Sequence, residues 1–445
     1  MPNRNIGQAY LDILIAIAIF LILASVLFTL TASALETITY SQARITARHL
    51  AQEKIELIRN LPYANVGTIG GIPYGPLPQS ENISRNGLNY YVKTSIVYID
   101  EPFDQLAPDD ILPIDHKKVR VDVSWEGLAA SRKKPITLIT DIAPKGVETT
   151  EGGGTLSILV FDADGEPIPQ AEVTIVAEEV NPPVNLSLNT SDNGRIILPG
   201  ALACNNCYKI LATKEGYSSE KTYSTDEIAN PDKPHQNVLE GKLTEISFAI
   251  DKLSSLTVLS TQDAQNNFAS LPNKTFRLKS DKTIGTDIND EFVYKFEKEF
   301  TTDNFGQLII TDLEWGNYQL LLPQPSDWVI FATNPLLPLI IFPNQEYQLS
   351  FALTGASENS FLASFVDTEQ TPIASVSALL SDGAGFEASA SSGVAENPDF
   401  GQAFFADLEA KNYLLQATAA GFLEFTNNIE ISGEAQKTFI LSGEE

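Results

Sequence analysis

An uncharged apolar stretch near the start of the chain limits its folding more than any other feature. From residue 13 to residue 30 every residue is apolar except Ser25 and Thr29, and no charge follows Asp12 until Glu36. About 20 apolar residues in a helix cross the hydrocarbon core of a bilayer. The stretch therefore predicts a transmembrane helix, and the single basic residue before it, Arg4, favours an N-terminus on the inner side.

The predicted helix is longer than a membrane is thick. Residues 8–61 contain neither Gly nor Pro, so one continuous helix is expected. At about 1.5 Å per residue it would extend roughly 80 Å, and its outer half must leave the bilayer. That half carries an apolar stripe at helical spacing, which predicts a partner surface. The stripe consists of Ala47, Leu50, Ala51, Ile55 and Ile58.

The residues around the start of this helix resemble the N-terminus of type IV prepilins. A short basic leader ends at Gly7, and Asp12 is the fifth residue after it. A carboxylate at the edge of a membrane segment is costly unless a cation neutralises it. The resemblance implies that a prepilin peptidase cuts between Gly7 and Gln8 and that the new N-terminus is methylated. It also implies that Asp12 is the filament-assembly carboxylate, paired with the amine of a neighbouring subunit.

The chain departs from this family at two positions, and two other interpretations remain open. The family commonly has Phe where this chain has Gln8, and Glu where it has Asp12. A secretory signal peptide is suggested by Ala32, Ser33 and Ala34, although the apolar run is longer than such signals usually are. A plain single-pass anchor explains the apolar run but accounts for neither Gly7 nor Asp12.

Residues 62–147 are predicted to form a small β head. A stretch rich in Gly and Pro, residues 62–78, is followed by alternating runs at 88–100, 117–127 and 134–144, which predict an antiparallel sheet. Trp125 is expected in its core. The segments 52–63 and 117–125 resemble PilV-like minor pilins and pseudopilins, which supports a pilin head.

The rest of the chain is repetitive. After the sequence EGGG at 151–154, interpreted as a flexible linker, three similar units are predicted at 153–251, 252–355 and 356–445. Their short strands and turns predict β-sandwiches, so the fold class is α+β with a long N-terminal helix. The units resemble carboxypeptidase regulatory-like, transthyretin-type domains, which usually act as spacers or binding modules. The matching positions are Gly194, Gly306 and Gly401, and Tyr208, Tyr318 and Tyr413.

Charge and cysteine content argue against several functions. The net charge is −28, and all of the negative excess lies after residue 60. A surface this acidic repels nucleic acid, which is therefore disfavoured as a partner. Cys204 and Cys207 fit a local disulfide or half of a four-ligand metal site. The chain has no other cysteine and its three histidines are scattered, so a disulfide is favoured, with reduced thiols as the alternative. No metal or cofactor site is predicted.

The remaining candidates for chemistry are weak. The sequence DADG at 162–165 resembles the start of a calcium loop but lacks the later acids, so a turn is expected. Trp315, in a predicted turn, is a candidate surface-contact aromatic, with packing on a neighbouring domain as the alternative. No pattern of nucleophile and base stands out. The chain is therefore predicted not to be an enzyme.

Together these features predict a structural or adhesive minor subunit of a type IV pilus or of a related type II secretion-like filament. Its expected partners are other pilin subunits, the prepilin peptidase, the cytoplasmic membrane and a surface glycan or protein ligand. It would be a single-pass membrane protein before assembly and extracellular afterwards. The alternative is a membrane-anchored surface binding protein that never enters a filament.

Overall fold

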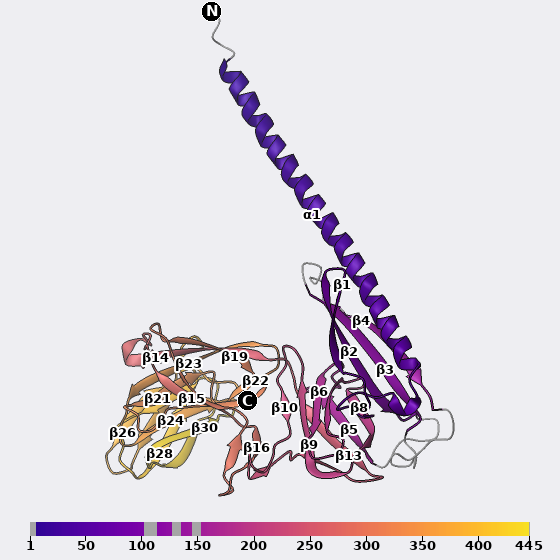
Figure 1. Ribbon diagram of the computed structural model, residues 1–445. Helices are drawn as coiled ribbons and strands as arrows, with labels where there is room; N and C mark the ends of the chain where they lie inside the picture. Colours follow the sequence, from indigo (N-terminus) through magenta and orange to yellow (C-terminus); the bar gives the residue numbers. More distant parts are fainter. Residues whose placement is uncertain (1–5, 102–113, 127–134, 145–152, 445) are drawn as a thin grey trace, which may run out of the picture.

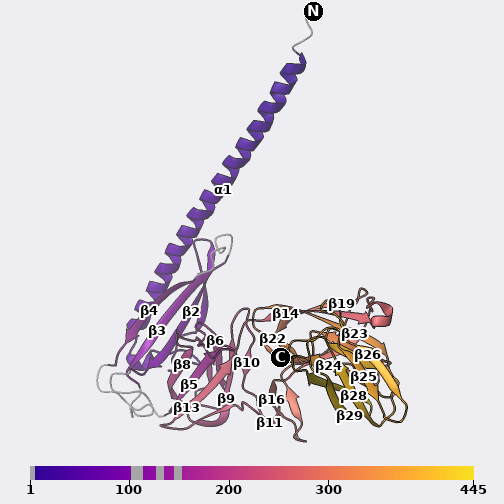
Figure 2. The same cartoon turned by 180° about the vertical axis from the view of Figure 1, so that it is seen from behind.

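A long helix and a series of separate β-sheets make up the chain, which confirms the α+β fold class. The computed structural model describes residues 6–101, 114–126, 135–144 and 153–444, without the side chains of residues 6–16 and 18. The N-terminus lies at the free tip of the helix and the β-sheets gather at its other end (Figure 1). The last two sandwiches lie to one side of the first (Figure 2).

Helix α1 (Ile6–Arg59) is 54 residues long and continuous. It ends shortly before Pro62, because a proline disfavours helical backbone in the residue before it. The predicted apolar stripe is confirmed: Ala47, Ala51 and Ile58 are fully buried and pack with the head in one hydrophobic cluster. The C-terminal half of the helix is thus a structural part of the head.

The head is a four-stranded antiparallel sheet in the order β1-β2-β3-β4, and α1 packs against β2, β3 and β4. Trp125 lies in its core, 9% exposed, with its ring 5.8 Å from that of Tyr40 on the helix. The bounds are β1 (Ser80–Arg85), β2 (Leu88–Ile99), β3 (His116–Trp125) and β4 (Ile136–Ile142), with a 3₁₀ turn η1 (Tyr63–Asn65) between α1 and the sheet.

Three β-sandwiches follow, each with two sheets that bury side chains against each other. The first contains β5 (Gly154–Phe161), β6 (Glu172–Ala177), β7 (Val184–Asn189), β8 (Arg195–Ala201), β9 (Cys204–Thr213), β10 (Glu220–Lys221), β12 (Gln236–Val238) and β13 (Leu243–Ala249). The second contains β14 (Ser254–Gln262), η3 (Ala264–Asn266), β15 (Thr275–Ser280), β18 (Glu297–Thr301), β19 (Gln307–Leu313), β20 (Gly316–Leu321), β21 (Trp328–Asn334), β22 (Leu339–Ile341) and β23 (Glu346–Gly355). The third contains β24 (Ser360–Val366), β25 (Ser377–Ser381), β26 (Glu387–Ser391), β27 (Gln402–Phe405), β28 (Asn412–Thr418), β29 (Phe425–Glu430) and β30 (Glu434–Ile440).

The three sandwiches share one topology, as the sequence repeat predicts. In each, the first strand pairs in parallel with the last: β5 with β13, β14 with β23, and β24 with β30. The matching glycines all adopt a positive φ, between +71° and +74°. At each of them an added Cβ would meet a backbone or proline atom closer than 3.0 Å, so a side chain is excluded for steric reasons as well.

The matching tyrosines are also equivalent. Tyr318 and Tyr413 donate their hydroxyl groups to the carbonyl oxygen four residues earlier, of Glu314 and Glu409. Tyr208 instead reaches back six residues, to Leu202, at 2.8 Å. The two extra residues in the Cys204 hairpin account for this difference. Burial raises the pKa of Tyr208 to about 12, so this hydroxyl remains a donor at physiological pH.

A repeated buried hydroxyl was not predicted from the sequence. Thr190 donates to the carbonyl oxygen of Ile168 and accepts from the backbone N–H of Ala171. In the third sandwich Ser392 makes the same two bonds: it donates to the carbonyl oxygen of Ile373 and accepts from the backbone N–H of Val376. Each hydroxyl satisfies two buried backbone groups, which would otherwise cost free energy.

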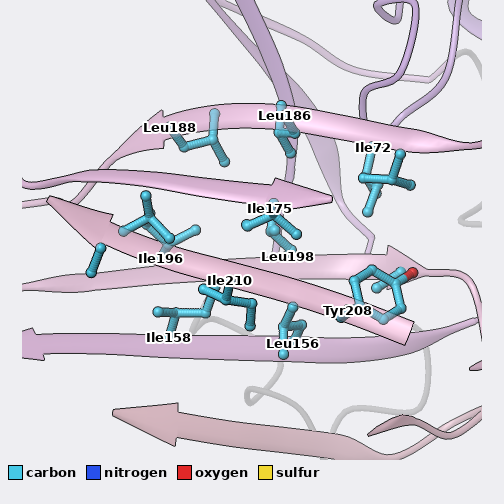
Figure 3. Close-up of a cluster of buried hydrophobic side chains, with 14 of the residues drawn as sticks. Ile72, Leu156, Ile158, Ile175, Leu186, Leu188, Ile196, Leu198, Tyr208 and Ile210 are labelled. Carbon is cyan, nitrogen blue, oxygen red and sulfur yellow. The ribbon is translucent and has the colours of Figure 1, made fainter. Parts of the chain in front are cut away.

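The head and the first sandwich are joined by a common core rather than by a linker alone. Ile72 of the head packs among side chains of the first sandwich (Figure 3), and Tyr98 belongs to the same cluster. The backbone N–H of Asn185 donates to the carbonyl oxygen of Gly70 at 2.6 Å. Of the predicted flexible linker, residues 151 and 152 lie outside the described residues. Gly154, however, is the buried first residue of β5, where a Cβ would lie 2.2 Å from the carbonyl oxygen of Leu239.

The other two junctions are equally specific. A small sheet of β11 (Asn230–Pro231), β16 (Thr283–Thr286) and β17 (Phe292–Tyr294) crosses the predicted boundary between residues 251 and 252. Between the second and third sandwiches, the backbone N–H of Thr333 donates to Gln402 at 2.6 Å. The side chain of Asn334 donates to the carbonyl oxygen of Asn397 at 2.8 Å. The four β domains are therefore fixed to one another by direct contacts.

We expect Asp399, beside this last junction, to make the chain more stable at low pH. Its side chain is 7% exposed, one carboxyl oxygen has no hydrogen-bond partner, and burial raises its pKa. The penalty for ionising it is absent below the unfolded pKa of about 3.9, grows as the pH rises toward the folded pKa, and is complete above the folded pKa. Asp399→Asn should therefore raise the unfolding temperature at pH 7, by an amount equivalent to about 1 kcal/mol, and much less at pH 3.5.

Thermal unfolding of both variants at the two pH values tests this. The matched control is Asp407→Asn, at an exposed site in the same sandwich. An equal change for both substitutions, or an Asp399→Asn effect that does not depend on pH, would contradict the assignment.

Candidate functional site

The N-terminal half of α1 is the most unusual surface of the molecule. Large apolar side chains are exposed at consecutive positions, and their exposed fractions range from 48% at Val26 to 76% at Phe28. Because consecutive residues point to different sides of a helix, the apolar surface surrounds it instead of forming one stripe. The exposed set includes Ile17, Ile19, Phe20, Leu21, Ile22, Leu23, Val26, Leu27, Phe28 and Leu30.

The polar groups within this segment are satisfied by the helix itself. Ser25 donates its hydroxyl to the carbonyl oxygen of Ile22, and Thr29 to that of Val26, both at 2.8 Å. Further along, Thr37 donates to Ser33 in the same way. Such bonds leave no hydroxyl in need of water, so the segment is suited to hydrocarbon. Within the described residues, one helix is long and apolar enough to cross a membrane, and none of its apolar window is buried.

The character of the helix changes where it reaches the head. Ala43 is the first of the buried stripe, and beyond it charged side chains fasten the helix to β1: Lys54 pairs with Glu81, and Glu53 with Arg85 at 3.1 Å. Arg44 and Arg48 are exposed. The helix thus has an unsupported apolar half and a half anchored on a folded domain.

The predicted processing and assembly residues lie in the free half. The backbone of Gly7, Gln8 and Asp12 is helical, because α1 begins at Ile6. Their side chains lie outside the described residues. The cut between Gly7 and Gln8 and the pairing of Asp12 remain predictions.

The two cysteines lie at one end of β9, in the first sandwich. The structure places the Sγ atoms of Cys204 and Cys207 next to each other, with their Cα atoms 6.1 Å apart, as the predicted disulfide requires. Asn206, between them, has a φ of +52° and donates its backbone N–H to the side chain of Asn237 at 2.6 Å. The bond closes a very short loop, so its effect on stability should be small, and its formation in the mature protein remains a prediction.

Trp315 lies beside a cluster of charges in the second sandwich. The Nζ atom of Lys282 lies 3.2 Å from the centre of its ring, and the same Nζ pairs with Glu314 at 2.9 Å. Lys295 also pairs with Glu314, at 2.7 Å. One face of the indole is therefore already occupied by a cation of its own domain. A role in ligand contact would have to use the other face, and it remains a prediction.

The acidic sequence DADG at 162–165 forms a turn. One carboxyl oxygen of Asp162 accepts the backbone N–H groups of Asp164 at 3.0 Å and Glu166 at 2.8 Å. Asp303 does the same in the second sandwich, with Phe305 and Gln307. These bonds close turns, as expected for the DADG sequence. In the part of the chain that the structure describes, no group of three or more Asp, Glu, His or Cys residues is arranged to hold a metal ion.

Comparison with known proteins adds three solved structures. No family model and no curated protein sequence matches the chain. The Bacillus anthracis TIE protein aligns over 83% of this chain and 74% of its own, with 15% identity and a TM-score of 0.19. A streptococcal ancillary pilin aligns over 66% and 99%, with 10% identity and a TM-score of 0.18. The minor pilin GBS52 of Streptococcus agalactiae aligns over 45% and 96%, with 12% identity and a TM-score of 0.22. TM-scores this low carry no functional argument.

Proposed function

We propose that the chain is a structural or adhesive minor subunit of a type IV pilus or of a related type II secretion-like filament. A prepilin peptidase removes residues 1–7, and the helix passes from the cytoplasmic membrane into a filament core. The three sandwiches are then presented outside the cell. This proposal goes beyond the comparisons and is supported by the helix and by the prepilin-like residues at its start.

The observation that carries the proposal is the division of α1 into two halves. The N-terminal half exposes apolar side chains on all sides, while one face of the C-terminal half is buried on the head. A membrane anchor needs only the first half. A filament subunit needs both, because the same apolar surface must be covered by lipid before assembly and by neighbouring helices afterwards, while the head keeps the helix in a fixed orientation.

The second candidate is an anchored surface protein that does not assemble. It is favoured by the same exposed helix, since a bilayer alone would cover the apolar side chains. The two candidates differ in what they require of Gly7, Gln8 and Asp12. Only the filament subunit needs a defined cut and a carboxylate at its fifth residue.

We expect the mature protein to begin at Gln8. Mass spectrometry or N-terminal sequencing of the chain from isolated filaments and membranes should find residues 1–7 missing. Gly7→Val should leave them attached, because a bulkier residue at the cut would obstruct the peptidase. The control is Asn5→Ala, which changes the leader away from the cut and should be processed normally. A mature chain that retains the leader, or that starts after Ala34, would contradict the proposal.

A further inference from the structure

A groove lies on the outer face of one sheet of the first sandwich. Its floor is formed by β6 and β9, and the segment 222–235 forms one wall. The volume is about 720 Å³, within the range of roughly 300–1,000 Å³ that is common for small-molecule sites. The floor side chains come from Thr174, Val176, Lys209 and Leu211. Those of Thr174 and Val176 on β6 are short, and all four are at least partly exposed.

The same face is filled in the second sandwich. Val176 pairs with Lys209, the residue after Tyr208, and Lys279 pairs with Gln319, the residue after Tyr318. Because the two tyrosines match in the repeat, Val176 and Lys279 occupy equivalent positions. By the same register, Arg277 corresponds to Thr174.

The long side chains at these positions occupy the face. Arg277 pairs with Glu297 at 3.2 Å, and the Nζ atom of Lys279 lies 3.8 Å from the centre of the Tyr294 ring. In the third sandwich the equivalent residues are Leu379 and Ser381. The first sandwich therefore has short side chains at two positions where the repeat also accepts long ones.

The two lysines that line the groove are each paired with an acid, and the lining also includes the carboxylates of Glu179 and Asp226. Lys221 pairs with Glu227 at 2.7 Å, and Lys209 with Glu178 at 3.0 Å. Burial lowers the pKa of His235, and the nearby Lys209 lowers it further, so this imidazole is neutral at physiological pH. Glu179 and Asp226 form no ion pair with a described residue, so they repel an anionic ligand and are free to accept hydrogen bonds from hydroxyl groups. Among carbohydrates, an uncharged sugar therefore fits better than an acidic one.

The groove has hydrogen-bonding groups on its wall and apolar groups on its floor. Tyr223, Ser224 and His235 supply donors and acceptors on the wall, opposite the apolar floor of Val176 and Leu211. Hydroxyl groups along one edge and C–H groups on the face are the chemistry of a sugar ring. We propose that this groove binds one or two units of an uncharged carbohydrate. The proposal does not depend on filament assembly, because purified protein can test it.

The experiment replaces two floor residues of the groove by the long side chains found at the equivalent positions of the second sandwich. The full chain is purified in a detergent without a sugar head group, and saturation-transfer NMR is recorded with lactose, maltose, cellobiose and chitobiose. At least one disaccharide should receive saturation from the wild-type protein. The double variant Thr174→Arg, Val176→Lys should weaken its binding at least about tenfold, or about 1.4 kcal/mol.

The control places the same charges at the equivalent positions of the third sandwich, as Leu379→Arg, Ser381→Lys, and should bind like the wild type. Leu211→Lys, at an exposed floor position, serves as a second blocking variant if the double variant fails to fold. Three results would overturn the proposal: no binding of any of the four disaccharides, binding that survives both blocking variants, or equal loss in the control. Preferential binding of a peptide that the sugars do not displace would also overturn it.

Discussion

Replacing Asp12 by alanine should remove the chain from filaments and leave it in the membrane. A carboxylate within a membrane helix costs about 2.5–3.5 kcal/mol on insertion scales, so alanine should make insertion easier. In the proposed filament, however, Asp12 recovers this cost by pairing with the amine created at Gln8 of a neighbouring subunit. Without the carboxylate, that amine has no partner in a region without water. We expect the amount of chain in sheared filaments to fall at least about tenfold.

The measurement is a comparison of filament and membrane fractions by immunoblot. Asp12→Glu should retain assembly, because it keeps the charge and reaches further. Ser25→Ala is the control within the same apolar segment, since its hydroxyl bonds only to its own helix. If Asp12→Ala entered filaments as well as wild type, the amine pairing would be wrong. If no form of the chain were found in filaments, the anchored surface protein would be the better account.

The sequence predicted those elements whose signals are local. The apolar run of α1 is visible within one segment, and so is the alternation of apolar and polar residues in β2 and β3. Strand β1 was missed because SENISR is polar and lies at the edge of the sheet, with no side chain fully buried. The short strands β11, β16 and β17 were missed for another reason: β11 pairs only with β16 of the next domain, and β16 and β17 are a hairpin of three or four residues each.

The same distinction applies to the candidate sites. Gly7 and Asp12 could be recognised because they lie close together in the sequence. The groove could not, because its floor and wall come from β6, β9 and the segment 222–235, and only their pairing brings them together. Trp315 was predicted as a candidate for surface contact, with packing as the alternative, and neither prediction included the cation of Lys282 over one face of its ring. Contacts of this kind depend on register, which composition does not reveal.

The repeat predicts which glycines cannot be replaced. Gly401 has a φ of +71°, and a Cβ there would lie 2.6 Å from the Cβ of Pro372. Gly421, in the same sandwich, has a φ of +80° with nothing within 4 Å. Both alanine variants carry the cost of a left-handed backbone, about 1–2 kcal/mol. Gly401→Ala must also displace its neighbours, which adds about 1–3 kcal/mol.

The total for Gly401→Ala is a large part of the roughly 5–15 kcal/mol that stabilises an ordinary domain. Because the sandwiches are separate cores, the loss should be local to the third one, and amide hydrogen exchange can locate it. Protection in β24 and β27 should fall far more in Gly401→Ala than in Gly421→Ala, while β5 and β8 of the first sandwich keep theirs. Gly194→Ala should reverse this pattern, since it occupies the same position in the first sandwich, 2.5 Å from the carbonyl oxygen of Val160. Equal effects of Gly401→Ala and Gly421→Ala would mean that the backbone conformation, and not the close contact, makes glycine necessary.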